Sequence, residues 1–290
     1  MERAQAFAAA HGAEHAYSSY EQLVADPEVD VVYVASPHSE HAAQARLAIA
    51  AGKPVLVEKP FTRNAAEAAE VARAATAAGV FAMEAMWPRF LPHTDVIRQL
   101  LADGALGEVI TVLADHGQIF DLDPVGRMFN PALAGGALLD LGVYPISFAS
   151  FVLGSPDSVV ATGSLTDTGV DAQASMVLTS GRAQACLNTT LLAKTPTTAT
   201  ISGTLGSLVS SGAFYAPGAL ILTGNDDRRL VREVDPIVGH FGMAFEGAHA
   251  ATLIADGATE SPLLPLDETI SVLHTIDSVR AQLGVRFPGE

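Results

Sequence analysis

The sequence predicts an α/β region built on a parallel sheet, followed by an α+β region built on an open, mostly antiparallel sheet. In residues 1–103, short apolar runs alternate with alanine-rich helical segments, which is the pattern of βαβ units. After Glu108, strand-like runs follow one another through short turn-like links such as Ser180-Gly181. A length of 290 residues suits two domains, with a boundary expected near residues 86–91.

Three strands and five helices are expected in the first region. The expected strands are short, apolar runs of the kind that is buried on both faces, and they span residues 29–35, 54–58 and 80–84. The expected helices span residues 2–11, 19–25, 39–51, 64–78 and 92–102. Asn64 and Glu67 have capping-box spacing, and Gly79 stands where a helix C-cap is expected.

Seven strands and three helices are expected in the second region. The strands span residues 108–115, 158–163, 172–178, 183–192, 197–202, 220–223 and 230–234. The helices span residues 140–153, 243–254 and 267–283, the last with Asp267 as its N-cap. These assignments divide the chain into residues 1–88, residues 89–266 and a C-terminal helix within residues 267–290.

Composition excludes several classes of protein. Sixteen basic and 32 acidic residues give a net charge of −16, so neither a nucleic acid nor an anionic membrane is expected as a partner. The single cysteine, Cys186, excludes an intrachain disulfide and a cysteine-based zinc site, and the nine histidines show no metal-ligand spacing. The N-terminus lacks the apolar segment of a secretory signal, so a cytoplasmic location is expected.

A parallel sheet that begins with βαβ units suggests a dinucleotide-binding fold. That fold needs a glycine-rich first turn, because the backbone must approach the pyrophosphate at a helix N-terminus. No G-x-G-x-x-G motif occurs in the sequence. The sequence is therefore expected to begin after the first elements of such a fold.

Polar residues follow the first predicted strand, at the edge where ligands bind in open α/β sheets. Ser36 and Pro37 are expected to line this crevice, and His38 or His41 could reach a ribose or a nicotinamide. The alternative is a helix N-cap at Ser39 with two solvated histidines.

The second predicted strand ends in Glu58-Lys59-Pro60. A lysine at this position projects over the same crevice. Its ammonium could hold a substrate hydroxyl and depress the pKa of a neighbouring acid. The alternative is a surface lysine that precedes a turn.

Asp140 and Tyr144 are four residues apart, which places them on one face of a helix. Because Pro145 is tolerated only in a first helical turn, the helix is expected to begin near Asp140. A tyrosine is a poor proton donor or acceptor at neutral pH unless a cation lowers its pKa, and Lys59 would be that cation. The alternative is an aromatic side chain in the core, with Asp140 as a helix cap.

Trp87 and Phe90 could form an apolar wall for a substrate, with Arg89 between them to fix a carboxylate, a phosphate or a carbonyl. The alternative for this cluster is packing between the two domains.

These four clusters, in this order, resemble the Gfo/Idh/MocA family of NAD(P)-dependent oxidoreductases, and within it a branch that acts on cyclic diols and on D-xylose. The resemblance rests on ASPHSEH at 35–41, AAGKPVLVEKPF at 50–61, MEAMWPRF at 83–90, GGALLDLGVYPI at 135–146 and residues 260–288. It implies a Rossmann domain, then an open antiparallel sheet that often forms a dimer face, and a final helix that packs back on the first domain.

The resemblance also implies roles for individual residues. Lys59 is expected near the reacting carbon, Tyr144 as general acid/base and Asp140 in support of that pair. By resemblance, the residues expected to contact the cofactor are Ser36, Pro37, His38, His41, Glu58 and Pro60, to which the residue clusters add Lys59 and Arg89. Those expected to contact the substrate are Tyr144 and, from their own cluster, Trp87 and Phe90.

One part of the family pattern is missing, namely the initial strand, glycine-rich turn, helix and second strand, which amount to about 35–40 residues. An N-terminally truncated Rossmann-type sheet is therefore expected, with the strand at 29–35 as a bare edge. A truncated or misassigned start, a non-catalytic relative and a rearranged site all remain open. The first is favoured because the downstream residues are present.

The expected function is hydride transfer between NADP or NAD and a carbon of a sugar or cyclic diol. NADP is favoured by analogy with the branch, and a homodimer through the antiparallel sheet is expected. The alternatives are a non-catalytic relative that senses a sugar or binds a partner, and a truncated enzyme that is inactive because it lacks the phosphate-binding turn.

Overall fold

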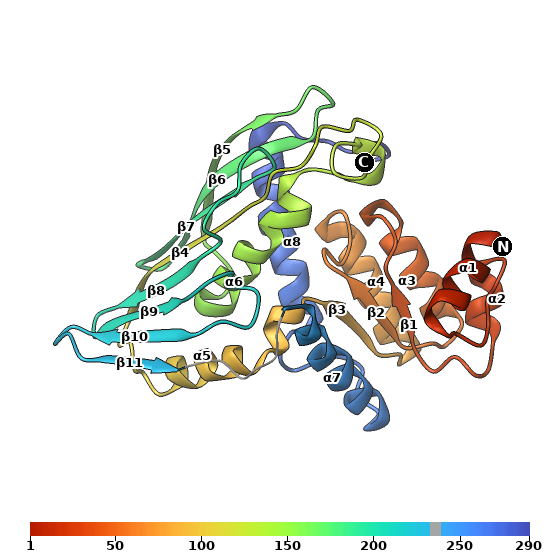
Figure 1. The fold of residues 1–290 in the computed structure, drawn as a ribbon, viewed down its shortest axis with the longest axis horizontal. Helices are drawn as coiled ribbons and strands as arrows, with labels where there is room; N and C mark the ends of the chain where they lie inside the picture. The colour runs from red at the N-terminus through yellow and green to blue at the C-terminus, as the bar shows by residue number, and fades with distance from the viewer. Residues whose placement is uncertain (233–238) are drawn as a thin grey trace.

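The computed structural model describes residues 1–232 and 239–290, which form two sheets with helices packed around them (Figure 1). The smaller sheet has three parallel strands in sequential order, namely β1 (Val32–Val34), β2 (Val55–Glu58) and β3 (Ala82–Ala85). Its helices are α1 (Glu2–His11), α2 (Tyr20–Ala25), α3 (His41–Ala50) and α4 (Ala65–Ala78). The predicted parallel α/β region is confirmed.

Local sequence signals set the ends of these helices. The Asn64 side chain accepts a hydrogen bond from the Glu67 amide at 2.9 Å, so the predicted N-cap of α4 is formed. Gly79 ends the same helix with a φ of 63°, a left-handed conformation that glycine adopts without steric cost. The helix predicted over residues 39–51 instead opens with a 3-10 turn (His38–Glu40), and α3 begins after it.

Strand β1 lies at one edge of the smaller sheet, because among the described residues it pairs only with β2. The predicted strand over residues 29–35 is too long, since only three residues have paired backbone. Val31 and Tyr33 are 44% and 48% exposed, so the prediction of burial on both faces is wrong for this strand.

The larger sheet has eight strands in the order β11-β10-β9-β8-β4-β7-β6-β5. They are β4 (Val109–Gly117), β5 (Ser158–Leu165), β6 (Asp171–Ser180), β7 (Ala183–Thr190), β8 (Ala199–Gly203), β9 (Gly206–Ser210), β10 (Leu220–Gly224) and β11 (Arg229–Arg232). Neighbouring strands are antiparallel except β4 and β7, which run parallel. A mostly antiparallel sheet is therefore confirmed.

Strand β9 is absent from the predicted strands. Glycine and serine have low strand propensity, and both are frequent in this segment. A Cβ on Gly206 would lie 2.5 Å from the Thr223 carbonyl oxygen, so the close approach of β9 to β10 requires glycine there. The strand predicted over residues 230–234 is observed as β11, and residues 233 and 234 lie outside the described residues.

The apolar segment before β5 forms two consecutive helical pieces. A π-helical turn (Leu138–Gly142) leads into α6 (Val143–Leu153), so the helix begins slightly before Asp140, where the sequence predicted its start. Pro145 is the third residue of α6, within the first turn where proline is tolerated.

Three further helices pack against the sheets, namely α5 (Pro92–Ala102), α7 (Ala244–Ala255) and α8 (Leu266–Leu283). The N-cap of α8 is Pro265 and not the predicted Asp267, which lies instead in the first turn. There its carboxylate favours the positive end of the helix dipole.

Helix α8 lies between the two sheets in the structure (Figure 1). Asp277 accepts a hydrogen bond from the Ala65 amide of α4 at 2.9 Å, and Gln282 accepts one from the Ala161 amide of β5 at 2.9 Å. Helix α8 therefore contacts elements beside both sheets.

One segment, Pro131–Leu153, is long and apolar enough to cross a membrane, with a mean hydropathy of 1.6. Sixty-seven per cent of its most apolar window is buried inside the structure, as in the core helix of a globular protein.

Candidate active site

The candidate site lies at the carboxyl ends of β1 and β2. Ser36 follows β1, and Lys59 follows Glu58, the last residue of β2. Because parallel strands end at the same edge of a sheet, these residues lie together and face the segment that precedes α6.

Lys59 and Asp140 form a largely buried ion pair, with side chains that are 14% and 8% exposed. The Lys59 Nζ donates to the Asp140 backbone carbonyl at 2.7 Å and to its Oδ1 at 3.1 Å. The Arg127 Nη1 lies 2.9 Å from the same Oδ1. Burial favours the neutral acid, but Lys59 and Arg127 outweigh it and hold the pKa of Asp140 well below its usual range. Arg127 is a site residue that the sequence analysis did not identify.

The charge of Lys59 is retained despite its burial. Burial alone lowers the pKa of an ammonium, but the negative charge of Tyr144, once it ionises at high pH, and that of Asp140 more than compensate, and the pKa of Lys59 is raised. The Lys59 Nζ lies 4.8 Å from the centroid of the Tyr144 ring, within the range of a cation–π contact. Lys59 thus contacts both of the other residues predicted as the catalytic group.

The expected effect of Lys59 on Tyr144 needs a correction. Lys59 does act to lower the pKa of the phenol, but burial acts more strongly in the opposite direction. The pKa of Tyr144 is therefore raised above its ordinary value, and the phenol is protonated at neutral pH.

Two further aromatic side chains surround Tyr144. The His116 ring at the end of β4 lies 5.2 Å from the Tyr144 ring, and the Tyr215 ring lies 4.9 Å from it. Burial lowers the pKa of His116 to about 4, so this imidazole is neutral. Neither residue belongs to a recognisable local motif, because the larger sheet brings them to Tyr144 from distant parts of the chain.

The two histidines after β1 are buried, so the alternative of solvated histidines is wrong. The His38 Nδ1 lies 3.0 Å from the Ala134 carbonyl oxygen, and its Nε2 lies 3.8 Å from Asp140 Oδ1. Burial lowers the pKa of His38 to about 3. His41 is fully buried, with its two ring nitrogens 2.8 Å from the Pro60 carbonyl oxygen and 2.9 Å from that of Ser36.

Pro37 and Glu58, which are also predicted to contact the cofactor, lie after β1 and at the end of β2. Pro37 is half-buried and accepts a hydrogen bond from the Glu40 amide at 2.9 Å. Glu58 accepts a hydrogen bond from the Tyr33 hydroxyl and one from the Lys59 amide. Their contact with a cofactor stays a prediction.

The structure gives Arg89 a role different from the predicted one. Its guanidinium makes a two-pronged ion pair with Glu268 of α8, at 2.7 and 3.0 Å, and its side chain is 6% exposed. Charged groups of this kind are buried only when they are paired, so Arg89 supports the packing of α8. This matches the alternative of inter-domain packing.

Trp87 and Phe90 are buried in different surroundings. The Trp87 ring lies 6.1 Å from Tyr215, which in turn contacts Tyr144, so Trp87 is part of the aromatic wall of the site. The Phe90 ring lies 5.0 Å from His249 of α7. Of the two, the structure links only Trp87 to the aromatic group around Tyr144.

The described residues fit the nicotinamide side of an NAD(P) site. The Ser36 Oγ is buried without a hydrogen-bond partner among the described residues. A buried hydroxyl of this kind usually has a partner, and a bound ligand at the end of β1 would supply one. Ser36 and Lys59 are the residues best placed to hold such a group.

Two family models match the chain. Residues 1–86 match the oxidoreductase family with an NAD-binding Rossmann fold, and residues 95–209 match the GFO/IDH/MocA C-terminal domain. The trans-1,2-dihydrobenzene-1,2-diol dehydrogenase of Macaca fuscata fuscata is 37% identical over 295 residues, which cover 99% of this chain and 87% of the relative. The protein of the same name from Homo sapiens is 36% identical, with the same coverage.

A solved structure extends this likeness to the fold. The aldose-aldose oxidoreductase of Caulobacter crescentus, crystallised with glycerol, has a TM-score of 0.86 and 27% sequence identity. The match covers 98% of this chain and 87% of that chain, and so includes both sheets. The chain therefore belongs to the Gfo/Idh/MocA family of NAD(P)-dependent oxidoreductases.

Proposed function

We propose that this oxidoreductase transfers hydride between the nicotinamide of NAD(P) and a secondary alcohol or hemiacetal carbon of a sugar or cyclic diol. The observation that carries the proposal is the buried Lys59 ammonium, which lies 3.1 Å from Asp140 Oδ1 and 4.8 Å from the Tyr144 ring centroid. An acid, a cation and a carboxylate in one buried cluster suit proton transfer to or from a substrate oxygen.

The nicotinamide supplies or accepts the hydride when it is bound. In the direction of reduction, the Tyr144 phenol gives its proton to the substrate carbonyl oxygen as negative charge develops there. Lys59 then stabilises the phenolate that remains, and Asp140 holds Lys59 in place. The raised pKa of Tyr144 supports this direction, because the phenol carries its proton at neutral pH.

The substrate class is proposed from the relatives. The curated relatives are named for a cyclic diol, and the structural relative is named for aldoses. Both kinds of molecule present a secondary hydroxyl or hemiacetal carbon next to further hydroxyls. We propose NADP as the preferred cofactor by analogy with the diol-dehydrogenase branch.

The test is turnover followed at 340 nm with each nicotinamide cofactor and a panel of aldoses and cyclic diols. Tyr144→Phe and Lys59→Met are expected to lower kcat by about 10²–10⁴-fold while the fold is kept. Tyr20→Phe is the matched control, since Tyr20 is 58% exposed on α2. Unchanged turnover in both site variants would falsify the assignment, and a folded chain that binds no cofactor would favour a non-catalytic relative.

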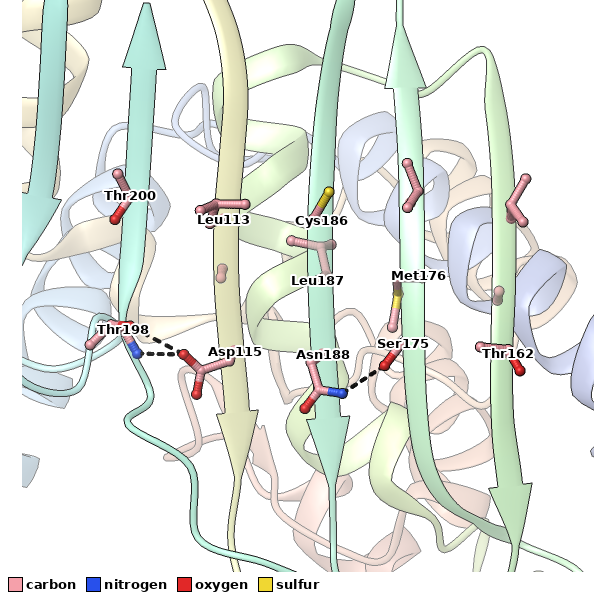
Figure 2. A pocket seen from close by; sticks show the side chains of 14 residues that line it. Leu113, Asp115, Thr162, Ser175, Met176, Cys186, Leu187, Asn188, Thr198 and Thr200 are labelled. Carbon is pink, nitrogen blue, oxygen red and sulfur yellow. Dashed lines mark hydrogen bonds between the residues drawn. The ribbon is translucent and has the colours of Figure 1, made fainter.

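We also propose that the outer face of the larger sheet binds a second copy of the chain. A hollow of about 630 Å³ extends over this face across β4 to β8, and Figure 2 shows the side chains that line it. Of its 14 lining residues only Asp115 is charged, although the chain carries a net charge of −16. A charge-poor face lets two acidic chains approach with little repulsion.

The dimer is tested by light scattering after size-exclusion chromatography. Leu113→Lys places a charge where a 47% exposed leucine points outward, and it is expected to give a monomer. Val31→Lys, beside the edge strand β1, is the control and is expected to leave the dimer intact. A dimer lost in the control and kept in Leu113→Lys would place the interface at β1 instead.

A further inference from the structure

Two buried carboxyl side chains, Glu84 and Asp171, have no part in the proposed proton transfer. Glu84 lies in β3 and is 2% exposed, and Asp171 begins β6 and is 1% exposed. Burial of a carboxyl group is costly unless hydrogen bonds compensate for it, so the partners of these groups indicate what they do.

Glu84 fixes the backbone that follows Lys59. Its Oε1 accepts a hydrogen bond from the Phe61 amide at 3.0 Å, and its Oε2 accepts one from the Thr269 hydroxyl of α8 at 3.1 Å. Phe61 is two residues after Lys59. The segment that carries the lysine is therefore joined to β3 and, through Thr269, to α8.

Asp171 fixes the backbone that precedes Asp140. Its Oδ2 accepts a hydrogen bond from the Leu138 amide at 2.6 Å, and Leu138 is two residues before Asp140. The carboxylate reaches this position because Gly136 has no side chain: a Cβ there would lie 2.2 Å from Asp171 Oδ1. Asp171 thus holds the first residue of the π-helical turn.

The Lys59–Asp140 contact is sensitive to the position of both segments. The lysine donates to the backbone carbonyl of Asp140 as well as to its carboxylate, at 2.7 and 3.1 Å. A shift of either backbone therefore disturbs two hydrogen bonds at once. Rotation of the Asp140 side chain can restore only one of them.

We propose that Glu84 and Asp171 are positioning residues, each of which fixes the backbone two residues away from one member of the Lys59–Asp140 pair. The inference rests on the proposed function for its catalytic meaning. The positioning itself is a property of the free chain and can be measured without substrate.

The first readout is the titration of Lys59, followed by NMR of the full chain labelled at the lysine ε-carbon. The sequence has three lysines, Lys53, Lys59 and Lys194, so its signals can be assigned by substitution. Glu84→Met and Asp171→Ala each remove a backbone acceptor. Loss of the Asp140 contacts is expected to increase the acidity constant of Lys59 at least about threefold in both variants.

Conservative variants distinguish an effect on the position of Lys59 from a general loss of protein stability. Glu84→Gln and Asp171→Asn keep one acceptor oxygen, and they are expected to restore a Lys59 titration close to that of the wild type. Asp277→Ala is the matched control, because it also removes a carboxylate that accepts a backbone amide, that of Ala65. It is expected to lower Tm without a change in the Lys59 titration.

The second readout is kinetic. Glu84→Met and Asp171→Ala are expected to lower kcat at least about tenfold, with the Kd for cofactor within about twofold of the wild type. If Glu84→Met fails to fold, Thr269→Val replaces it, since this change removes only the hydroxyl that binds Glu84. Folded variants in which Lys59 titrates as in the wild type overturn the inference. A wild-type chain without turnover, but with the expected change in Lys59, contradicts the proposed function alone.

Discussion

Arg127 connects the buried ion pair to the surface. Its side chain is 52% exposed, yet its Nη1 lies 2.9 Å from Asp140 Oδ1, the oxygen that Lys59 also contacts. Asp140 therefore shares one negative charge between two cations. Part of the positive charge of Lys59 is therefore not neutralised by Asp140, and it limits how far burial raises the pKa of Tyr144.

Arg127→Gln is expected to lower kcat/KM by about tenfold. Without the arginine, Asp140 neutralises Lys59 more completely, so the pKa of Tyr144 rises further and proton transfer becomes less favourable. The measurement is the pH profile of kcat/KM, whose basic limb should move to higher pH. Arg127→Lys keeps the charge and is expected to retain most of the activity. A profile that coincides with that of the wild type in Arg127→Gln would contradict this account.

Lys59, Asp140 and Tyr144 could be predicted from the sequence because general rules place them. Strand ends meet at one edge of a parallel sheet, and residues four apart share a helix face. Arg127 and Glu84 could not be predicted in the same way. Their roles depend on which backbone or carboxylate lies opposite, and this is decided by the packing of the larger sheet and of α8.

At the scale of elements, the turn before α6 has the strictest steric requirement that we describe. Gly136 has a φ of 116°, and a Cβ there would lie 2.2 Å from Asp171 Oδ1. Gly79 at the end of α4 also has a positive φ, of 63°, but a Cβ there would meet nothing within 4 Å. Both glycines have a positive φ, which other residues rarely adopt, but only at Gly136 would a side chain also clash with a neighbouring atom.

Gly136→Ala is expected to destabilise the protein by about 3 kcal/mol or more, since backbone strain and displacement of a buried carboxylate add. Gly79→Ala carries the strain alone and is expected to cost about 1 kcal/mol. Urea denaturation followed by circular dichroism measures both. Equal decreases in the free energy of unfolding of the two variants would show that the clash with Asp171 does not contribute to the effect of Gly136→Ala.

The ends of helices were easier to predict than those of strands. Asn64 and Gly79 act within their own helix, so the sequence alone indicates where α4 begins and ends. The length of β1 depends on its neighbours, and β9 is a strand because β8 and β10 pair with it. Pairing partners are distant in the sequence, and local composition does not report them.

At the scale of the whole molecule, buried ionisable groups determine how stability depends on pH. Burial raises the pKa of Glu84 and of Asp171 to about 7, and that of Glu246 to about 8. Each acid is ionised in the unfolded chain above about pH 4.5. The contribution of these groups is therefore greatest below that pH and is lost as the pH rises through 7 and 8.

The free energy of unfolding is expected to fall between pH 6.5 and 8.5, by on the order of 2 kcal/mol from Glu246 alone. Below pH 6.5 the buried histidines His38 and His116 act in the opposite direction, because they ionise only in the unfolded chain. Urea denaturation at several pH values measures how steeply the free energy of unfolding falls with pH. Glu246→Gln should make this fall less steep above pH 6.5, and an unchanged pH dependence would exclude Glu246 as its source.

The position of α8 has a consequence for biosynthesis. This helix contacts α4 and β5, yet it is formed by residues 266–283, close to the end of the chain. A ribosome adding about 5–20 residues per second makes β3 roughly ten seconds or more before α8. During that interval the smaller sheet has an uncovered apolar surface, and a nascent chain in this state is a natural substrate for chaperones.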